Sequence, residues 1–304
     1  MSKRQENNRP KAMKRLVFAV DVKGSAGKSF FQSHLLEALS QWGIRARGYD
    51  PDTSFHRMEA MCGPDRVTRL NFEDAESRSI PVIDLVEDRC DVAIIDGVGS
   101  QLSKQKAYFK AVDFFANVTD LNLVTTFVAL VEDDTVIFEQ VARLIGDVGE
   151  RADWVFVKNP KLFNEQFNPE GDQEFRFPVW DRSEIRRKAL SELPSAEIML
   201  PKLSQKEAAY LVENNATTLK ASKDTRLFAL QRSGFKTMWK RIEKQIKEAK
   251  PSAEFAAANF WSEASTIEGF YFRPLIDGQC AEEANEAVSQ SFASKRSMRS
   301  VRSG

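Results

Sequence analysis

The most constraining feature of this sequence is an apolar segment that breaks into a turn of small residues and resumes as a helix. The turn reads Lys23-Gly24-Ser25-Ala26-Gly27-Lys28-Ser29. Small residues let successive backbone N–H groups converge on a phosphate, a lysine supplies a cation, and a serine hydroxyl can ligate Mg²⁺. The following helix would direct its unpaired N–H groups at the same point. The pattern predicts a phosphate-binding loop made of Gly24, Ser25, Ala26, Gly27, Lys28, Ser29 and Phe30.

Composition indicates a globular chain without a dominant charge. The 304 residues are 42% hydrophobic and 29% charged, and 44 Lys and Arg balance 44 Asp and Glu. A nucleic-acid or membrane partner would therefore have to be recognised by a local patch. Three scattered cysteines and two histidines have no zinc spacing, which favours a reducing compartment. No run is apolar enough for a bilayer span or a signal peptide, so we expect a cytoplasmic protein.

The chain alternates short apolar runs with amphipathic segments, as in repeated βαβ units. Strands are expected at 16–20, 44–49, 92–95, 123–131, 154–157 and 197–200, with the strand at 92–95 beside the first. Helices are expected after the loop and over 135–148, 183–193, 204–221 and 223–249, with a short extended piece near 175–179. The predicted fold class is α/β: a P-loop NTPase with a mostly parallel, doubly wound sheet flanked by helices and a helical C-terminal extension.

Four segments follow from this pattern. Residues 1–15 are predicted to be a basic, flexible N-terminus, and residues 16–222 the P-loop ATPase domain. Residues 223–250 form a basic amphipathic helix packed on, or extending, that domain. Residues 251–304 have little pattern and end in a tail without acidic residues from Ala287 onward, which we expect to be disordered and basic.

Carboxylates at strand ends complete the predicted site. Asp96 closes the run at 92–95 and is the candidate for holding Mg²⁺ together with Ser29. Asp50 and Asp52 close the second strand and are expected at the same edge of the sheet. The alternatives are structural: Asp96 can cap a helix, and Asp50-Pro51 can form a simple turn.

The first half of the loop departs from the general Gly-x-x-x-x-Gly-Lys-Ser/Thr form, since Val22 stands where Gly is expected and Lys23 precedes Gly24. This deviant form resembles the ParA and MinD family of ATPases. The resemblance implies that Lys23 reaches across a dimer interface to the partner's nucleotide and that Asp50 or Asp52 acts in hydrolysis. Ser25 stands where the family usually has Gly. It keeps a small side chain, so nucleotide binding is still expected, but it lacks the freedom of glycine at positive φ, so the rate of hydrolysis is not expected to follow the family.

The same resemblance implies where the base lies. An Asn after the fifth strand, here Asn159, would hydrogen-bond adenine, and Pro201 after the last strand would stack on it. The alternative for Asn159 is a turn-forming role in Asn-Pro. No guanine-reading Asn-Lys-x-Asp occurs, so the expected cofactors are ATP and Mg²⁺.

The leading hypothesis is a ParA-like ATPase, slow without a partner, that acts as an ATP-dependent homodimeric switch. It would serve segregation, mobilisation or conjugative maintenance of a plasmid or similar DNA element, binding DNA non-specifically or through a DNA-bound adaptor protein. One alternative is a small-molecule kinase or ligase of the dethiobiotin-synthetase type on the same fold. Another is a nucleotide-binding scaffold with little turnover, which Ser25 allows.

Overall fold

The computed structural model describes residues 14–20, 27–52, 54–97, 109, 114–131, 135–160 and 177–249. Its strands are β1 (Lys14–Val20), β2 (Ala46–Asp50), β3 (Val67–Arg69), β4 (Val92–Ile95), β5 (Leu123–Val131), β6 (Asp153–Lys158) and β7 (Ser195–Met199). Its helices are α1 (Lys28–Gln41), α2 (Arg57–Cys62), α3 (Ala75–Val86), α5 (Phe114–Asp120), α6 (Thr135–Val148), the 3-10 turn η2 (Gly149–Arg151), α7 (Pro178–Arg182), α8 (Glu184–Glu192), α9 (Gln205–Glu213), α10 (Thr218–Lys223) and α11 (Ala229–Glu248).

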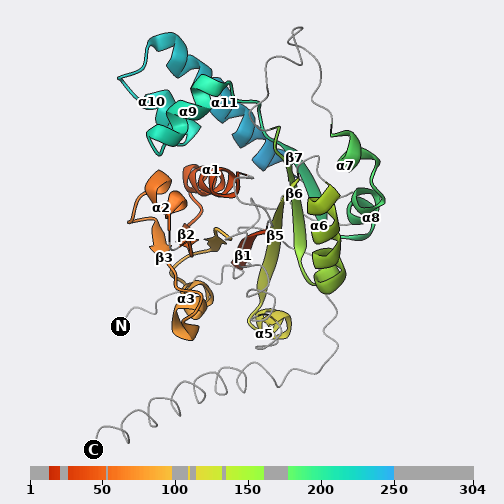
Figure 1. Cartoon of the computed structure of the whole chain (residues 1–304). Helices are drawn as coiled ribbons and strands as arrows, with labels where there is room; N and C mark the ends of the chain where they lie inside the picture. Colours follow the sequence, from red (N-terminus) through yellow and green to blue (C-terminus); the bar gives the residue numbers. More distant parts are fainter. Residues whose placement is uncertain are drawn as a thin grey trace, which may run out of the picture.

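The strands form one parallel sheet in the order β3-β2-β4-β1-β5-β6-β7 (Figure 1). β1 lies in the middle, with Leu16 in register with Ala93 of β4 on one side and Thr125 of β5 on the other. Each crossover is helical, so both faces of the sheet are covered, as all-parallel sheets require. The predicted α/β fold class is confirmed, as is the expectation that the strand at 92–95 lies beside the first.

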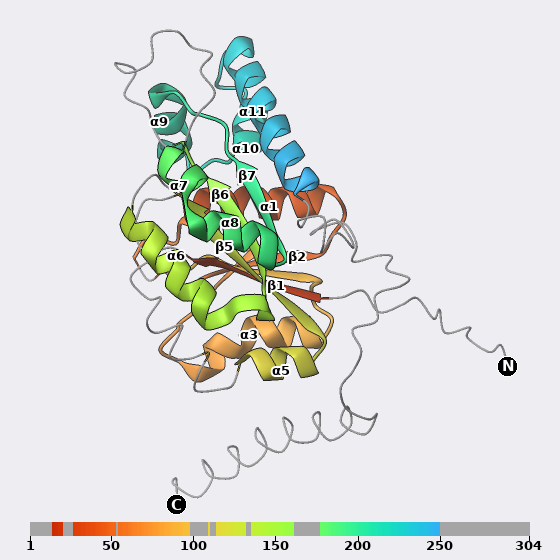
Figure 2. The ribbon, with the colours of Figure 1, turned by 90° about the vertical axis from the view of Figure 1, so that its right-hand side faces the viewer.

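Alternate residues of the strands feed two separate cores. Phe18, Phe127 and Trp154 lie on the face covered by α3, α5, α6 and α8, whereas Val17 and Val128 lie on the face covered by α1, α2 and α11. Figure 2 shows α3, α5 and α6 on one side of the sheet and α1 with α11 on the other. The first core is rich in stacked and edge-on aromatic rings, such as Phe127 on Trp154 at 5.2 Å. These strands read as continuous apolar runs because both of their faces are buried.

The last three helices form a layer, which we call the α9–α11 layer, outside α1 (Figure 1). Trp239, Ile242 and Ile246 of α11 are buried against the α1 face of the sheet. Burial of such side chains stabilises by about 1.5 to 3 kcal/mol each. A smaller core, which includes Leu211 and Phe235, joins the three helices to one another. The apolar face of α11 is therefore used for packing.

His34 of α1 joins that helix to α10. Its Nδ1 lies 2.6 Å from the Phe30 carbonyl oxygen, and its Nε2 accepts from the Thr218 backbone N–H at 3.0 Å and lies 2.9 Å from Thr218 Oγ1. This pattern requires the neutral ring with the proton on Nδ1. Burial lowers the pKa of His34 to about 4, although the bond to Phe30 acts in the opposite direction. The joint is therefore neutral at physiological pH.

Several local expectations were wrong. The helix expected over 204–221 is interrupted where Asn215 adopts φ +44, and Thr217 then caps α10 through its side chain. The helix expected from 223 begins only at Ala229, because Asp224 and Arg226 form a hydrogen-bonded turn. Pro178 and Val179 begin α7 instead of lying in an extended piece. The helix α3 and the shorter elements β3, α2 and α5 were not expected, while the domain boundaries stay predictions.

The His34 joint predicts a pH-dependent stability. Unfolded His34 titrates near 6.5 and the folded residue near 4, so the unfolded state binds more protons between those values and stability declines as pH falls through that window. We expect the free energy of unfolding to decline by about 2 kcal/mol more between pH 7 and pH 5 in the unaltered protein than in H34Q. Urea denaturation at both pH values measures this. Equal declines in the two proteins would contradict it, and His56 cancels because both proteins retain it.

Candidate functional site

The candidate site lies at the carboxyl edge of the central strands. The strand order reverses at β1, which has β4 on one side and β5 on the other, and ligands of open parallel sheets bind at such switch points. β1, β2 and β4 end beside one another there, as the Asp96 backbone N–H bonded to the Tyr49 carbonyl at 2.9 Å shows. α1 starts at the same edge. Lys23, Gly24, Ser25 and Ala26 lie outside the described residues, so their assignments stay predictions.

Gly27 and the first residues of α1 form the described part of the predicted phosphate loop. Gly27 has φ +94, a conformation that only glycine adopts readily, and its carbonyl accepts from Phe31 N–H at 3.0 Å. Lys28 begins the helix and is only 8% exposed. The first N–H groups of an α-helix have no partners within the helix, so they are available to an anion. The centroid of the Phe30 ring lies 4.1 Å from that of the His34 ring, and the predicted role of Phe30 in nucleotide binding stays a prediction.

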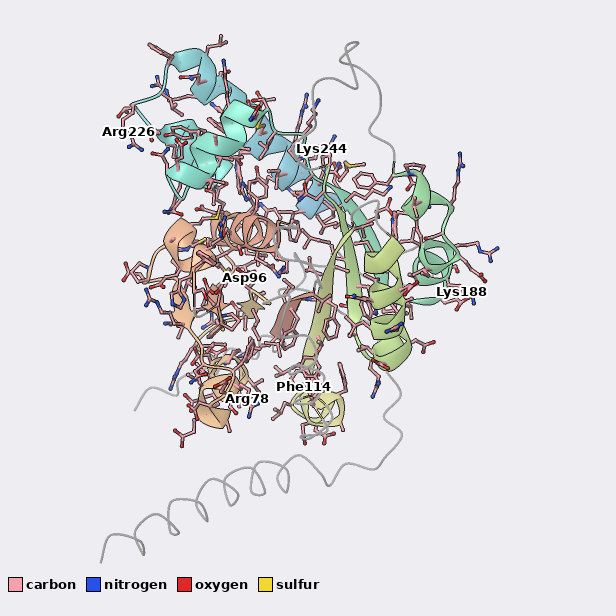
Figure 3. The ribbon with its side chains drawn as sticks, in the orientation of Figure 1. Arg78, Asp96, Phe114, Lys188, Arg226 and Lys244 are labelled. Carbon is pink, nitrogen blue, oxygen red and sulfur yellow. The ribbon has the colours of Figure 1, made fainter. Side chains whose placement is uncertain are left out.

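Asp96 lies beneath the start of α1 (Figure 3), and its side chain interacts with Ser29, Lys28, Asp50 and Asp52. Ser29 hydrogen-bonds the Asp96 carboxyl. Asp96 is 4% exposed, and its Oδ1 is buried and accepts no hydrogen bond from the described residues. Burial raises the pKa of Asp96 to about 7, with the carboxylates of Asp50 and Asp52 adding to the rise and Ser29 and Lys28 opposing it. The structure therefore brings the predicted metal-site pair Ser29 and Asp96 together.

These oxygen donors fit Mg²⁺. A buried carboxylate oxygen that accepts no hydrogen bond from the described residues and a serine hydroxyl beside it are hard ligands of the kind Mg²⁺ prefers. Magnesium at nucleotide sites is usually held by one or two such groups together with phosphate oxygens and water. The described part of the chain holds no cluster of three or more His, Cys, Asp or Glu side chains that could bind a metal. Bound Mg²⁺ would offset the charge that burial makes unfavourable on Asp96.

Asp50 and Asp52 differ in what their carboxylates do. Asp50 is fully buried; its Oδ1 accepts from Asp52 N–H at 3.0 Å, and its Oδ2 accepts from Met58 and Glu59 N–H at 3.1 and 3.3 Å. It thereby binds the first turn of α2. Burial raises the pKa of Asp50, and the backbone bonds from Asp52 and Glu59 oppose that rise. Asp52 is more accessible and uses its Oδ1 in a turn, accepting from Ser54 N–H at 2.8 Å and from Phe55 N–H at 3.3 Å.

Two further predicted residues lie on other strands of the sheet. Asn159 follows β6, and its side-chain amide lies against Gly27. Pro201 follows β7, the edge strand three positions from β1. The base-binding roles of both stay predictions.

Sequence reasoning missed His56. This residue precedes α2 with φ +39, interacts electrostatically with Asp50, and has a buried Nδ1 without a hydrogen-bond partner among the described residues. The signal in the sequence is weak, because a single histidine after an Asp-Pro turn is not a recognisable motif.

Three comparisons with known proteins were made, of which only the one with solved structures found matches. No protein-family model matches the chain, and no curated protein matches it. Among solved structures, MinD cell division protein of Aquifex aeolicus is 12% identical with a TM-score of 0.42, the alignment covering 76% of this chain and 94% of that one. The MinC:MinD complex of the same organism gives 14% and 0.43, with 76% and 96% covered. The receptor FtsY of Elizabethkingia anophelis, in complex with GDP, gives 14% and 0.41, with 64% and 59% covered.

The described helices include none that is both long and apolar enough to cross a membrane.

Replacing the buried acid at 96 tests its electrostatics. The folded pKa of Asp96 is about 7 against a usual 3.8, so the folded state holds its proton more tightly than the unfolded state does. The resulting contribution of Asp96 to the free energy of unfolding is complete below pH 3.8 and is lost as pH rises through 7. D96N removes this charge, and we expect its stability relative to the unaltered protein to grow by about 2.5 kcal/mol between pH 5 and pH 8. Urea denaturation without nucleotide or Mg²⁺ is the measurement. A difference that is constant with pH would contradict the assignment.

Replacement of Asp50 and replacement of Asp52, at the end of β2, should change the free energy of unfolding by different amounts. D50A leaves one buried and two partly buried backbone N–H groups without their acceptor, and we expect a loss of about 3 kcal/mol in the free energy of unfolding. D52A is its matched control and should lose less than about 1 kcal/mol, because Asp52 caps an exposed turn. Equal losses in the two variants would show that Asp50 does not hold α2.

Proposed function

We propose that this protein is an ATP-dependent molecular switch of the ParA and MinD kind that hydrolyses ATP slowly with Mg²⁺. The observation that carries the proposal is the meeting of Lys28 and Ser29, at the start of α1, with a buried Asp96 carboxyl whose Oδ1 has no described hydrogen-bond donor. A cation, a hydroxyl and an acid at the carboxyl edge beside the central strand are the parts that phosphoryl transfer requires.

Each group has a definite task in this proposal. Lys28 and the first N–H groups of α1 bind the β- and γ-phosphates. Ser29 and Asp96 hold Mg²⁺, which neutralises charge developing on the phosphate oxygens. Asp52 orients the attacking water, since Asp50 already binds three backbone N–H groups. We assign the nucleotide as ATP because the sequence has no guanine-reading Asn-Lys-x-Asp.

Lys23 makes the proposed switch dimeric. In the resemblance stated above, this lysine contacts the nucleotide of a second subunit, so two copies would enclose two ATP molecules and separate after hydrolysis. A metabolic kinase or ligase on the same fold would not need a lysine that acts in a second subunit. The binding of DNA, directly or through an adaptor, and a role in plasmid segregation, mobilisation or conjugative maintenance complete the proposal.

The exposed side of the α9–α11 layer is basic, which favours a polyanionic partner. Residues 202–249 hold eleven Lys or Arg and five Asp or Glu, whereas the whole chain is neutral. On α11, Lys236, Lys240, Arg241, Lys244 and Lys247 are exposed while the apolar side of the helix is buried. Figure 3 shows Lys244 and Arg226 on the outside of this layer. Lys244 is paired only loosely with Glu248, at 3.9 Å. Such a face can bind phosphates regardless of sequence.

Two lysine variants test the switch. K28A should bind ATP about 100-fold more weakly, because it removes a charge-assisted phosphate contact. K23A should keep its affinity for ATP within about threefold and lose ATP-dependent dimerisation, because its lysine acts on the partner's nucleotide. Titration calorimetry measures affinity, and analytical ultracentrifugation with and without ATP measures dimerisation. Unchanged ATP affinity in K28A would overturn the phosphate site. Dimerisation and ATPase activity that both survive in K23A would overturn the switch.

The basic face is tested by salt dependence. The triple variant K236A/K240A/K247A should reduce the magnitude of the slope of log affinity for duplex DNA against log salt by about 3, since each phosphate contact contributes about 0.9. R187A/K188A is the control, because these cations lie on α8 and already pair with Glu184 at 3.4 and 3.3 Å. Fluorescence anisotropy with ATP over a series of salt concentrations is the measurement. Equal slopes for the triple variant and the unaltered protein would assign the face another role.

A further inference from the structure

Gly27 has a neighbour where any other residue would carry its side chain. A Cβ built on Gly27 would lie 2.6 Å from Asn159 Nδ2 and 3.6 Å from Leu130 Cδ2. Real Cβ atoms do not approach another atom as closely as 2.6 Å. The Asn159 amide therefore occupies the space beside the Gly27 Cα, at the residue immediately before α1.

Asn159 is held firmly from its own side. Its backbone N–H donates to the Val131 carbonyl at 3.3 Å, which continues the pairing of β6 with β5 by one residue. Pro160 follows and is buried, and a residue before proline is restricted to extended conformations. The preceding Lys158 is anchored by Asp181 at 2.6 Å and by Glu197 at 2.7 Å. The side chain of Asn159 thus projects toward Gly27 from a fixed point at the carboxyl edge.

We propose that Asn159 is a positioning residue for phosphate binding, whose amide packs on Gly27 and holds the left-handed turn from which α1 starts. The inference rests on the proposed function, since it assigns Asn159 to the phosphate end of the nucleotide. It differs from the adenine-binding role that the resemblance implies. Asn159 acts through Gly27, so its effect extends to any ligand that binds the first N–H groups of α1.

The physical reason is the freedom of glycine. Gly27 can adopt positive and negative φ with similar ease, and only one of these directs the chain into α1 as observed, with φ +94. A side chain packed against its Cα restricts that choice before the ligand arrives. Preorganisation of this kind raises affinity by reducing the ordering that binding requires.

The test compares ATP with inorganic tripolyphosphate, each with Mg²⁺, by titration calorimetry of the full chain. A positioning residue acts on both ligands, so N159A should weaken both by the same factor, about tenfold. N117A is the control, because Asn117 is exposed and lies on α5, at the opposite edge of the sheet (Figure 1). Thermal unfolding and circular dichroism show that each variant is folded. A loss confined to ATP, or unchanged affinity for tripolyphosphate, would overturn the inference.

A second measurement needs no ligand. If the Asn159 amide fills the space at Gly27, G27A should lower the Tm by at least about 2 °C more in the unaltered background than in N159A, where that space is open. Additive changes would show that the two residues do not interact and would overturn the inference. If the unaltered chain binds neither ATP nor tripolyphosphate, the proposed function and this inference fall together. That result is distinct from a loss seen in N159A alone.

Discussion

The buried carboxyl of Asp96 beneath the start of α1 is the interaction on which the site depends. A charge at this depth is unfavourable, which is why burial raises the pKa of Asp96 to about 7. Nearby cations and hydroxyl donors stabilise the charged form of this carboxyl, and Lys28 and Ser29 are the groups that do so here. A protein built for stability alone would place an apolar or amide side chain here. In the proposed function, a bound ligand completes the charge of this acid.

α1 connects this site to the rest of the molecule. Its amino-terminal end faces the predicted phosphate position, while His34 joins its middle to α10 and Trp42 donates to Glu243 of α11 at 3.1 Å. Nearly every side of the helix is therefore covered, and its polar residues Gln32, Ser33 and His34 are buried together with its apolar ones. The α9–α11 layer, whose exposed side is basic, packs on the same helix that begins at the proposed phosphate site.

Much of the sheet could be predicted, because its strands are buried on both faces and read as apolar runs of the right length. The runs that became β4, β5 and β6 were expected to within a residue at each end. β3 could not be predicted, since it is three residues long and only Val67 is buried. The break between α9 and α10 was also missed, because the left-handed Asn215 and the capping Thr217 are ordinary residues whose roles depend on packing.

The sequence by itself determined the local pattern: small residues, a lysine and a serine between a buried strand and a helix, with aspartates at the ends of later strands. Only the tertiary structure decided how those aspartates differ. Asp50 accepts hydrogen bonds from two backbone N–H groups of α2 and from that of Asp52, which precedes α2. Asp96, in contrast, lies buried with an oxygen that accepts no hydrogen bond from the described residues. Spacing places residues at an edge of a parallel sheet. Burial and the neighbouring N–H groups, which depend on segments far apart in the chain, then determine which carboxylate is structural and which can hold a metal.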